Sequence, residues 1–258
     1  MRNSPDNRKT YDQAFFAKHL GGMSESANAV LSLIFARFQP RSVVDIGCGQ
    51  GVWLKAAAAL GATTLKGIDG DWVQCADLTH PSIEFEPADL AHSLPKLDKR
   101  YDLCISLEVA EHLPEDQSER FVDLLCSTSD VILFGAAVPH QGGPGHINEQ
   151  WQSFWIERFR SRGFECFDCI RPAIWNNPAV EWWYRQNCFV FLGPDETTID
   201  RESLRALERP IVDLVHPLNY RSRLHRYRKM IDNPSLRFCA GCSRRWLVTG
   251  LKRLFGLP

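Results

Sequence analysis

The chain has 258 residues, of which 44% are hydrophobic and 24% charged, and its formal net charge is −1. This length and composition allow one large buried core. No run approaches the eighteen or more apolar residues of a membrane-spanning helix, and the polar residues 1–4 precede no signal-peptide core. Nine cysteines, an odd number scattered through apolar runs, suit buried side chains in a reducing compartment. We therefore expect a cytoplasmic, globular chain.

Helix and strand patterns alternate along most of the chain. Apolar residues recur at helical spacing after Ser24 and stop at Pro40, and short apolar runs of strand length follow. The expected elements in chain order are a helix over 24–38, a strand over 42–46, a helix over 52–60, strands over 65–69, 83–86 and 101–107, a helix from Pro114, a strand over 131–138, a helix that Asn148 caps and whose buried stripe is Trp151, Phe154, Trp155 and Phe159, and strands over 164–170 and 188–192. Such alternation predicts an α/β fold whose parallel sheet is covered by helices on both faces and binds ligands beyond the carboxyl ends of its strands.

Glycines and acids gather where the first expected strands end. A strand that contains Asp45 runs into three alternating glycines, which let the backbone turn sharply and approach a ligand closely. Asp69 ends the next strand, where a carboxylate can accept both hydroxyls of a ribose. Asp89 and Leu90 follow the third strand, placed for the amino group and the ring face of an adenine. The sequence thus predicts a nucleoside site at this edge of the sheet.

A glycine-rich turn of this kind could also hold a dinucleotide pyrophosphate. Its spacing departs from G-x-G-x-x-G, because the third glycine comes one residue early and an acid precedes the first. An acid would repel a pyrophosphate, whereas an amino group tolerates or needs one. A nicotinamide or flavin enzyme is therefore the less favoured alternative.

Three segments resemble the motifs of one family. Residues 43–51 (VVDIGCGQG) look like the first motif of Rossmann-like methyltransferases that depend on S-adenosylmethionine (SAM). Residues 67–69 (GID) resemble the family's ribose-binding acid, and residues 107–113 (LEVAEHL) its fourth-strand motif. The resemblance covers about residues 10 to 195, with the motifs in order and at fitting spacings.

The resemblance implies the fold and the cofactor. The fold would be doubly wound, with a mostly parallel seven-stranded sheet and an antiparallel last strand, and the cofactor would be SAM. Residues 47–49 would then cradle its methionine part, Asp69 its ribose and Asp89 with Leu90 its adenine, while Leu107 and Glu108 would line the methyl-donor pocket. The full set of expected cofactor residues is Asp45, Gly47, Cys48, Gly49, Gly51, Asp69, Gly70, Asp89, Leu90, Leu107 and Glu108.

The loop over residues 139–151 is expected on the acceptor side. It resembles a loop of bacterial methyltransferases from glycan and small-molecule pathways, and its glycines permit a lid. An oxygen acceptor must lose a proton, so the candidate catalytic residues are His146, His112 and Glu149, with His140 less favoured. The alternative is that Asn148 and Glu149 merely start a helix and the histidines bond to backbone.

Two further clusters have structural alternatives. The aromatic residues over 175–184 could stack on an acceptor ring, although packing against the core is the favoured interpretation. Cys166 and Cys169 have the spacing of a zinc site with Cys239 and Cys242, but residues three apart in a strand point to opposite faces. No acidic cluster indicates magnesium, so we predict no metal.

The end of the chain is strongly basic. After His216, ten Arg and Lys residues stand against one acid, Asp232, and residues 244–255 place apolar and basic side chains on opposite helical arcs. This pattern predicts a methyltransferase domain over 1–195 and a basic helical extension over 196–258. The extension could contact the inner membrane surface, while a helix docked on the domain is the alternative.

The expected function is transfer of a methyl group from SAM to an oxygen (or nitrogen) of a small molecule, a glycan or a lipid-linked glycan intermediate. A catalytically silent SAM-binding regulatory or assembly protein is one alternative. A nucleic-acid methyltransferase is the other, and it is disfavoured because residues 106–109 lack an Asn/Asp-Pro-Pro-Tyr-like motif and no RNA-binding fold pattern is present.

Overall fold

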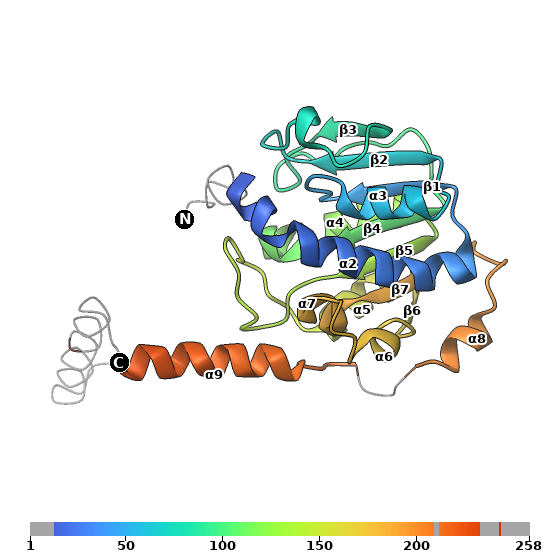
Figure 1. Cartoon of the computed structure of the whole chain (residues 1–258). Helices are drawn as coiled ribbons and strands as arrows, with labels where there is room; N and C mark the ends of the chain where they lie inside the picture. The colour runs from blue at the N-terminus through green and yellow to red at the C-terminus, as the bar shows by residue number, and fades with distance from the viewer. Residues whose placement is uncertain (1–12, 209–211, 233–242, 244–258) are drawn as a thin grey trace. The chain divides into compact units, whose positions relative to one another are not determined.

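The computed structural model describes residues 13–208, 212–232 and 243. Its centre is a seven-stranded sheet in the order β3-β2-β1-β4-β5-β7-β6 (Figure 1). Every neighbouring pair from β3 to β5 is parallel, and β7 runs antiparallel to both β5 and β6. The strands are β1 (Ser42–Ile46), β2 (Thr64–Asp69), β3 (Ile83–Pro87), β4 (Leu103–Leu107), β5 (Val131–Gly135), β6 (Glu165–Phe167) and β7 (Phe189–Leu192). The mostly parallel seven-stranded sheet and its antiparallel last strand are confirmed.

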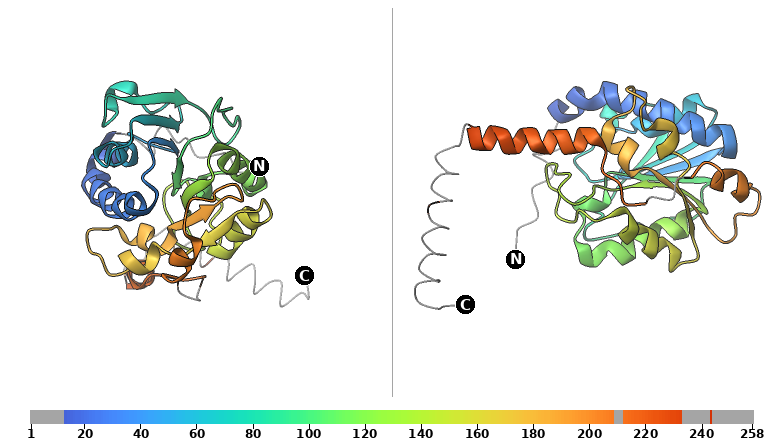
Figure 2. Two further views of the ribbon diagram at one scale, coloured as in Figure 1. Left: turned by 90° about the vertical axis from the view of Figure 1, so that its right-hand side faces the viewer. Right: turned by 90° about the horizontal axis from the view of Figure 1, so that it is seen from below.

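Helices cover both faces of the sheet (Figure 2). One face packs on α2 and α3 through a cluster that includes Val30, Leu54 and Leu103. The other face packs on α4 and α5 through Phe121, Phe159 and their neighbours. The central strands β4 and β5 are buried along their whole length, as a parallel sheet with two covered faces requires. The helices are α2 (Gln13–Phe38), α3 (Val52–Ala59), α4 (Ser118–Thr128), α5 (Gln152–Arg160), α6 (Arg171–Ile174), α7 (Trp182–Asn187), α8 (Arg201–Arg205) and α9 (Pro217–Asp232), with short 3₁₀ turns η1 (Cys75–Asp77), η2 (Ala110–His112) and η3 (Glu115–Gln117).

Several expected boundaries are wrong: the strand expected over 131–138 ends at Gly135, and the one expected over 164–170 spans only Glu165–Phe167. Helix α2 begins at or before Gln13, well before Ser24, and α5 begins at Gln152 rather than after Asn148. Asn148 does not cap α5, because its side-chain amide donates 3.1 Å to the Ser118 hydroxyl of another helix. Trp151 is 43% exposed and so lies outside the buried stripe of α5.

The chain forms two compact units, residues 1–216 and 217–258. In the first, α8 joins the main core through Leu204, which is 1% exposed. In the second, α9 carries the exposed Arg221, Arg226 and Arg228. The structure thus carries the first unit past residue 195, the boundary that the sequence suggested, as far as His216.

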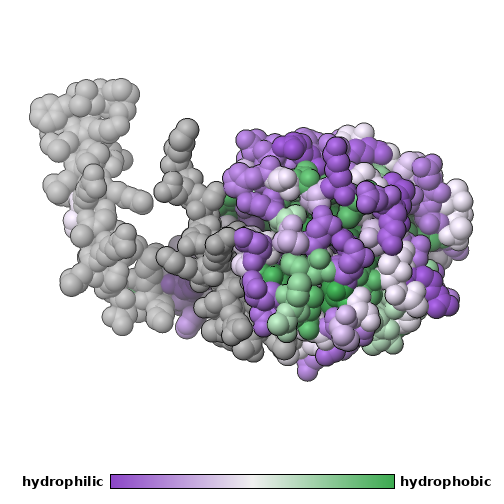
Figure 3. All heavy atoms as spheres, turned by 90° about the horizontal axis from the view of Figure 1, so that it is seen from above, coloured by the Kyte–Doolittle hydropathy of each residue, from purple (hydrophilic) through white to green (hydrophobic). Residues whose placement is uncertain are grey.

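One face of the molecule is mainly polar where its residues are described (Figure 3). Figure 3 shows this face, where hydrophilic residues predominate around a smaller apolar area. Within the described residues, no helix has the length and apolar character needed to cross a bilayer.

Candidate active site

The loop between β1 and α3 turns on three glycines with left-handed backbone. Their φ angles are +89° at Gly47, +51° at Gly49 and +77° at Gly51, which favour glycine over any residue with a Cβ. The amides of Gly47 and Cys48 both donate to the carbonyl of Ile68, at 2.7 and 3.1 Å. The loop is therefore tied to the carboxyl end of the neighbouring strand β2.

Close packing also dictates the first glycine. A Cβ at Gly47 would lie 2.2 Å from Cγ2 of Val109, which follows β4. The glycine loop and the segment after β4 therefore touch. A larger side chain at position 47 would therefore collide with Val109.

Asp69 links the same loop to the end of β2. Its Oδ2 accepts from the amide of Gly49 and its Oδ1 from the amide of Gly70, both at 2.7 Å. Burial raises the pKa of Asp69, while these two amides and a hydrogen bond from the Trp72 side chain lower it. A carboxylate has about four acceptor positions, of which the two amides and the Trp72 side chain use three, so one is left. The geometry therefore leaves Asp69 able to accept a hydroxyl group of a ligand.

Asp45 lies inside the protein. It is 2% exposed, and its Oδ2 has no hydrogen-bond partner within the described part of the chain. Burial raises its pKa well above the usual value, and the charge of Asp69 raises it further. A direct contact of Asp45 with a cofactor stays a prediction.

Asp89 and Leu90 lie beyond the end of β3. Oδ1 of Asp89 accepts from the amide of Ala91 at 3.1 Å, and its Oδ2 lies 2.9 Å from Nδ1 of His92. Leu90 is 8% exposed and packs in the core on the α4 and α5 face. The structure brings this pair to the same edge of the sheet as Asp69, because β2 and β3 are parallel neighbours.

Glu108 directly follows β4 in a conformation that is rare for its residue type. Its φ is +58°, and its amide donates 2.8 Å to the carbonyl of Gly135 at the end of β5. The carboxylate accepts from the side-chain amides of Asn187 at 2.8 Å and Gln141 at 2.7 Å. Burial raises the pKa of Glu108, although the Asn187 hydrogen bond opposes this shift. A strained backbone at a strand end, held by side-chain amides, is typical of a functional position.

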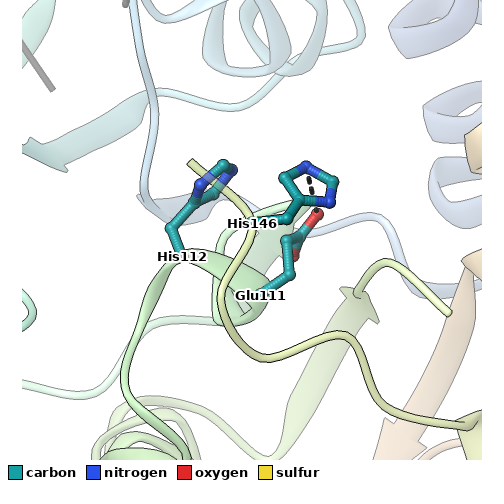
Figure 4. A group of neighbouring side chains, drawn as sticks. All are labelled: Glu111, His112 and His146. Atoms are coloured by element: carbon teal, nitrogen blue, oxygen red, sulfur yellow. Dashed lines mark ion pairs between the residues drawn. The ribbon is translucent and has the colours of Figure 1, made fainter. Parts of the chain in front are cut away.

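Next to it, Glu111, His112 and His146 converge from two segments (Figure 4). One nitrogen of each histidine and one carboxylate oxygen of Glu111 all lie within 4.8 Å of one another. The two histidine rings meet edge to face with centroids 4.9 Å apart, and Nε2 of His146 is 3.9 Å from Oε1 of Glu111. Burial and the neighbouring His146 lower the pKa of His112 to about 4, so its imidazole is neutral at pH 7. Burial raises the pKa of Glu111 well above its usual value, and the charge of Glu108 raises it further.

Glu149 orients His146. Its Oε1 lies 2.9 Å from Nδ1 of His146 and also accepts from the amide of Gly142. Burial opposes ionisation, but the hydrogen bonds from His146 and Gly142 lower the pKa of Glu149, so it is a carboxylate at neutral pH. A carboxylate only accepts, so Nδ1 of His146 carries hydrogen and Nε2 faces Glu111. His140 is exposed, and it meets this group through its backbone amide, which hydrogen-bonds to Glu149. Its ring makes no contact with the group among the described residues.

Sequence reasoning singled out His112, His146 and Glu149, which the structure brings together. It left three site residues unassigned, namely Glu111, Gln141 and Asn187. Glu111 stood inside the fourth-strand motif, so its position beside His112 was a usable signal. Asn187 is more than seventy residues from Glu108 along the chain, so no local sequence pattern predicts their contact.

The structure describes the aromatic segment over 175–184 fully and the cysteine set only in part. Tyr184 is buried and meets Trp53 edge to face at 5.1 Å between ring centroids, in agreement with a packing role for the aromatic segment. Cys166 and Cys169 carry free thiols in the structure, whereas Cys239 and Cys242 lie outside the described residues.

Comparisons with known proteins agree with this architecture. A family model described as a methyltransferase domain matches residues 20–168. A tRNA U34 carboxymethyltransferase of Ectopseudomonas mendocina is 25% identical over 201 residues, which are 67% of this chain and 61% of the relative. One of Azotobacter vinelandii is 26% identical over 195 residues, with the same two shares. The chain thus spans about three fifths of the length of these curated relatives.

Solved structures share the fold at low identity. DesVI of Streptomyces venezuelae has a TM-score of 0.54 and 13% identity, covering 73% of this chain and 98% of its own. DhpI in complex with S-adenosylhomocysteine has a TM-score of 0.53 and 19% identity, covering 74% and 96%. The family match extends over more than half of the chain and includes the glycine loop, Asp69 and the segment after β4. The chain belongs to the family of Rossmann-like, SAM-dependent methyltransferase domains.

Proposed function

We propose that this chain transfers the methyl group of SAM to an oxygen (or nitrogen) of a small molecule, a glycan or a lipid-linked glycan intermediate. The observation that carries the proposal is the contact between two groups of residues. The glycine loop packs against Val109. Glu111 and His112 follow Val109 in the chain, two and three residues later. A cofactor site and a cluster of proton-handling groups therefore share one edge of the sheet.

The residues on the cofactor side fit SAM. Asp69 retains acceptor capacity for a ribose hydroxyl, and the left-handed glycines leave three of the five loop positions without a side chain. Asp69 accepts from two backbone amides and Glu108 from two side-chain amides, which are partners that suit a carboxylate, so this pair favours a cationic ligand and disfavours a pyrophosphate. When bound, SAM supplies an electrophilic methyl group on a sulfonium.

The residues on the acceptor side fit proton removal. Methyl transfer is an in-line displacement, so positioning supplies much of its rate, and an oxygen nucleophile must also lose its proton. Glu149 holds His146 with Nε2 directed at Glu111, beside the neutral imidazole of His112. This group would bind the acceptor and lower the barrier to its deprotonation.

A tRNA acceptor is the second candidate. It is favoured by the curated relatives, which are tRNA U34 carboxymethyltransferases, and by the exposed arginines of α9, which suit phosphates. The small-molecule proposal and the tRNA candidate differ in the size and the ribonuclease sensitivity of the product.

One labelling experiment separates the candidates. The full chain is incubated with methyl-labelled SAM and, in parallel, with polar metabolites, lipid-extractable material and total RNA from a bacterial lysate. Label in a metabolite or lipid fraction supports the proposal, and ribonuclease-sensitive label supports tRNA. If no fraction gains label from protein that binds SAM, the catalytic proposal fails and a silent SAM-binding protein is indicated.

A further inference from the structure

The group formed by Glu111, His112 and His146 has the composition of a metal centre. One carboxylate and two imidazoles are the donors that zinc, manganese, iron and related divalent ions take in proteins. The three come from two segments, η2 and the loop before α5, and Figure 4 shows them converging on a common space. We expected no metal from the sequence, because the cysteine pair lies in a strand and no acidic cluster stood out. The two segments that meet here are more than thirty residues apart.

Glu111 supplies an independent observation. It is 0% exposed, and within the described structure no donor meets hydrogen-bond geometry at either carboxylate oxygen, although the backbone amides of Glu111 and Ala137 and the Glu108 carboxyl are near enough to act on its pKa. Among the described residues, no lysine or arginine forms an ion pair with Glu111 or with its neighbour Glu108. A buried carboxylate without partners is costly, and binding a cation is the usual way in which proteins offset that cost.

The surroundings of the histidines match those of metal ligands. A ligating histidine normally donates its other ring N–H to a carboxylate or a carbonyl, which fixes the ring and its tautomer. Nδ1 of His146 is held by Glu149, and His112 is hydrogen-bonded to the backbone of Gly145. Nε2 of His146 therefore presents its lone pair toward Glu111, 3.9 Å away.

The spacing is close to that of a loaded site. Ligand atoms around a tetrahedral ion at about 2.1 Å are roughly 3.4 Å apart. Here the candidate atoms lie within 4.8 Å, so side-chain shifts of about an ångström would close the site. Gly143 leaves room beside it, because a Cβ there would lie 2.2 Å from Nε2 of His146.

We propose that Glu111, His112 and His146 bind one first-row divalent cation, and that this ion positions the oxygen of the methyl acceptor. The binding site stands on the geometry above, while the role in catalysis rests on the proposed function. The ion would hold the acceptor's oxygen and lower the pKa of its hydroxyl. The proton leaves to solvent, the oxygen forms a bond to the methyl carbon, and the carbon–sulfur bond breaks with its electron pair on sulfur.

The direct test is metal binding by the full chain, without any acceptor. Protein stripped with a chelator is dialysed against Zn²⁺, Mn²⁺ or Mg²⁺, and bound metal is counted per chain. We expect one equivalent of Zn²⁺ or Mn²⁺ and an affinity at least tenfold lower in Glu111→Gln, His112→Ala and His146→Ala. The matched controls are Glu115→Gln, an exposed acid, and His80→Ala, a histidine outside the group, and both should bind as the wild type does.

A fourth variant removes no ligand. Gly143→Ala would push a methyl group against Nε2 of His146, and because Gly143 does not have a positive φ the backbone tolerates alanine. We expect it to weaken metal binding tenfold or more while SAM affinity stays unchanged. Absence of a stoichiometric ion on folded wild-type protein overturns the site, as does equal affinity in the ligand variants. SAM binding measured on the same samples shows whether the proposed function survives that failure.

Discussion

At the scale of single residues, the most specific prediction concerns the effect of His146 on turnover. Its Nδ1 is held by the Glu149 carboxylate, and its Nε2 faces the buried Glu111. We predict that His146→Ala lowers the turnover number by about 10²–10⁴, the usual size of the loss when help in deprotonating the acceptor is removed, while SAM affinity stays within twofold. The measurement is S-adenosylhomocysteine formation at a saturating level of the active fraction, with His80→Ala as control. A loss smaller than about threefold would remove His146 from the mechanism.

Asp45 predicts a dependence of stability on pH. Burial and the charge of Asp69 raise its pKa in the folded state, so the folded chain keeps a proton that the unfolded chain has released. The free energy of unfolding should therefore fall as pH rises from the ordinary value of 3.8 toward the raised pKa, by up to about 1.4 kcal/mol for each pH unit. Asp45→Asn should lack this fall.

Urea unfolding of both proteins between pH 4 and 8 measures the effect. The stability difference between Asp45→Asn and wild type should shift in favour of the variant with rising pH and then level off. A difference that is constant across the range would contradict a raised pKa for Asp45.

At the scale of elements, the sequence predicted the strands better than the contacts between distant segments. Short apolar runs bounded by glycine or proline placed β1, β2 and β3 within one residue, since buried parallel strands are apolar throughout. The start of α5 was missed because Asn148 is a good capping residue, yet its amide finds Ser118 thirty residues away. Glu111 and His146 meet for the same non-local reason.

Arg171 illustrates what local patterns leave out. It is 1% exposed, its guanidinium makes two hydrogen bonds to Asp168 at 2.7 and 2.8 Å, and it donates 2.9 Å to the carbonyl of Val212. We predict that Arg171→Ala lowers the free energy of unfolding by about 3–5 kcal/mol, because it leaves the Asp168 charge buried and unpaired.

A matched exposed pair gives the comparison. Arg160 and Glu157 are both about two thirds exposed, so Arg160→Ala should cost less than about 1 kcal/mol. Urea unfolding midpoints measure both variants. If Arg171→Ala costs no more than Arg160→Ala, burial of the Asp168 charge does not carry the cost that we predict.

At the scale of the whole molecule, the basic end of the chain predicts a second interaction. The chain after His216 carries ten Arg and Lys residues against one acid, although residues 244–258, with their amphipathic pattern, lie outside the described structure. We propose that this extension binds anionic membrane surfaces. The protein should then sediment with anionic vesicles and dissociate as salt rises, because screening weakens each Lys or Arg contact.

Truncation tests that proposal. Removing residues 243–258 should abolish sedimentation and leave SAM affinity intact. In the full chain, the fluorescence of Trp246 should shift to the blue when vesicles bind. Neutral vesicles are the control. Loss of SAM binding on truncation, or no binding of the full chain at low salt, would instead favour a helix docked on the domain.

The cofactor site at the ends of β1 and β2 is the central claim, and SAM binding to Asp69→Ala tests it most directly. Asp69 joins Gly49 to the end of β2 and keeps acceptor capacity for a ribose. By calorimetry, the wild type should bind one SAM per chain, and Asp69→Ala should bind it roughly 1–3 kcal/mol more weakly, about 5- to 150-fold, as expected for hydrogen bonds to a charged acceptor. Asp98→Ala, at an exposed acid, should match the wild type. Unchanged affinity in folded Asp69→Ala, or no SAM binding by the wild type, would contradict the account.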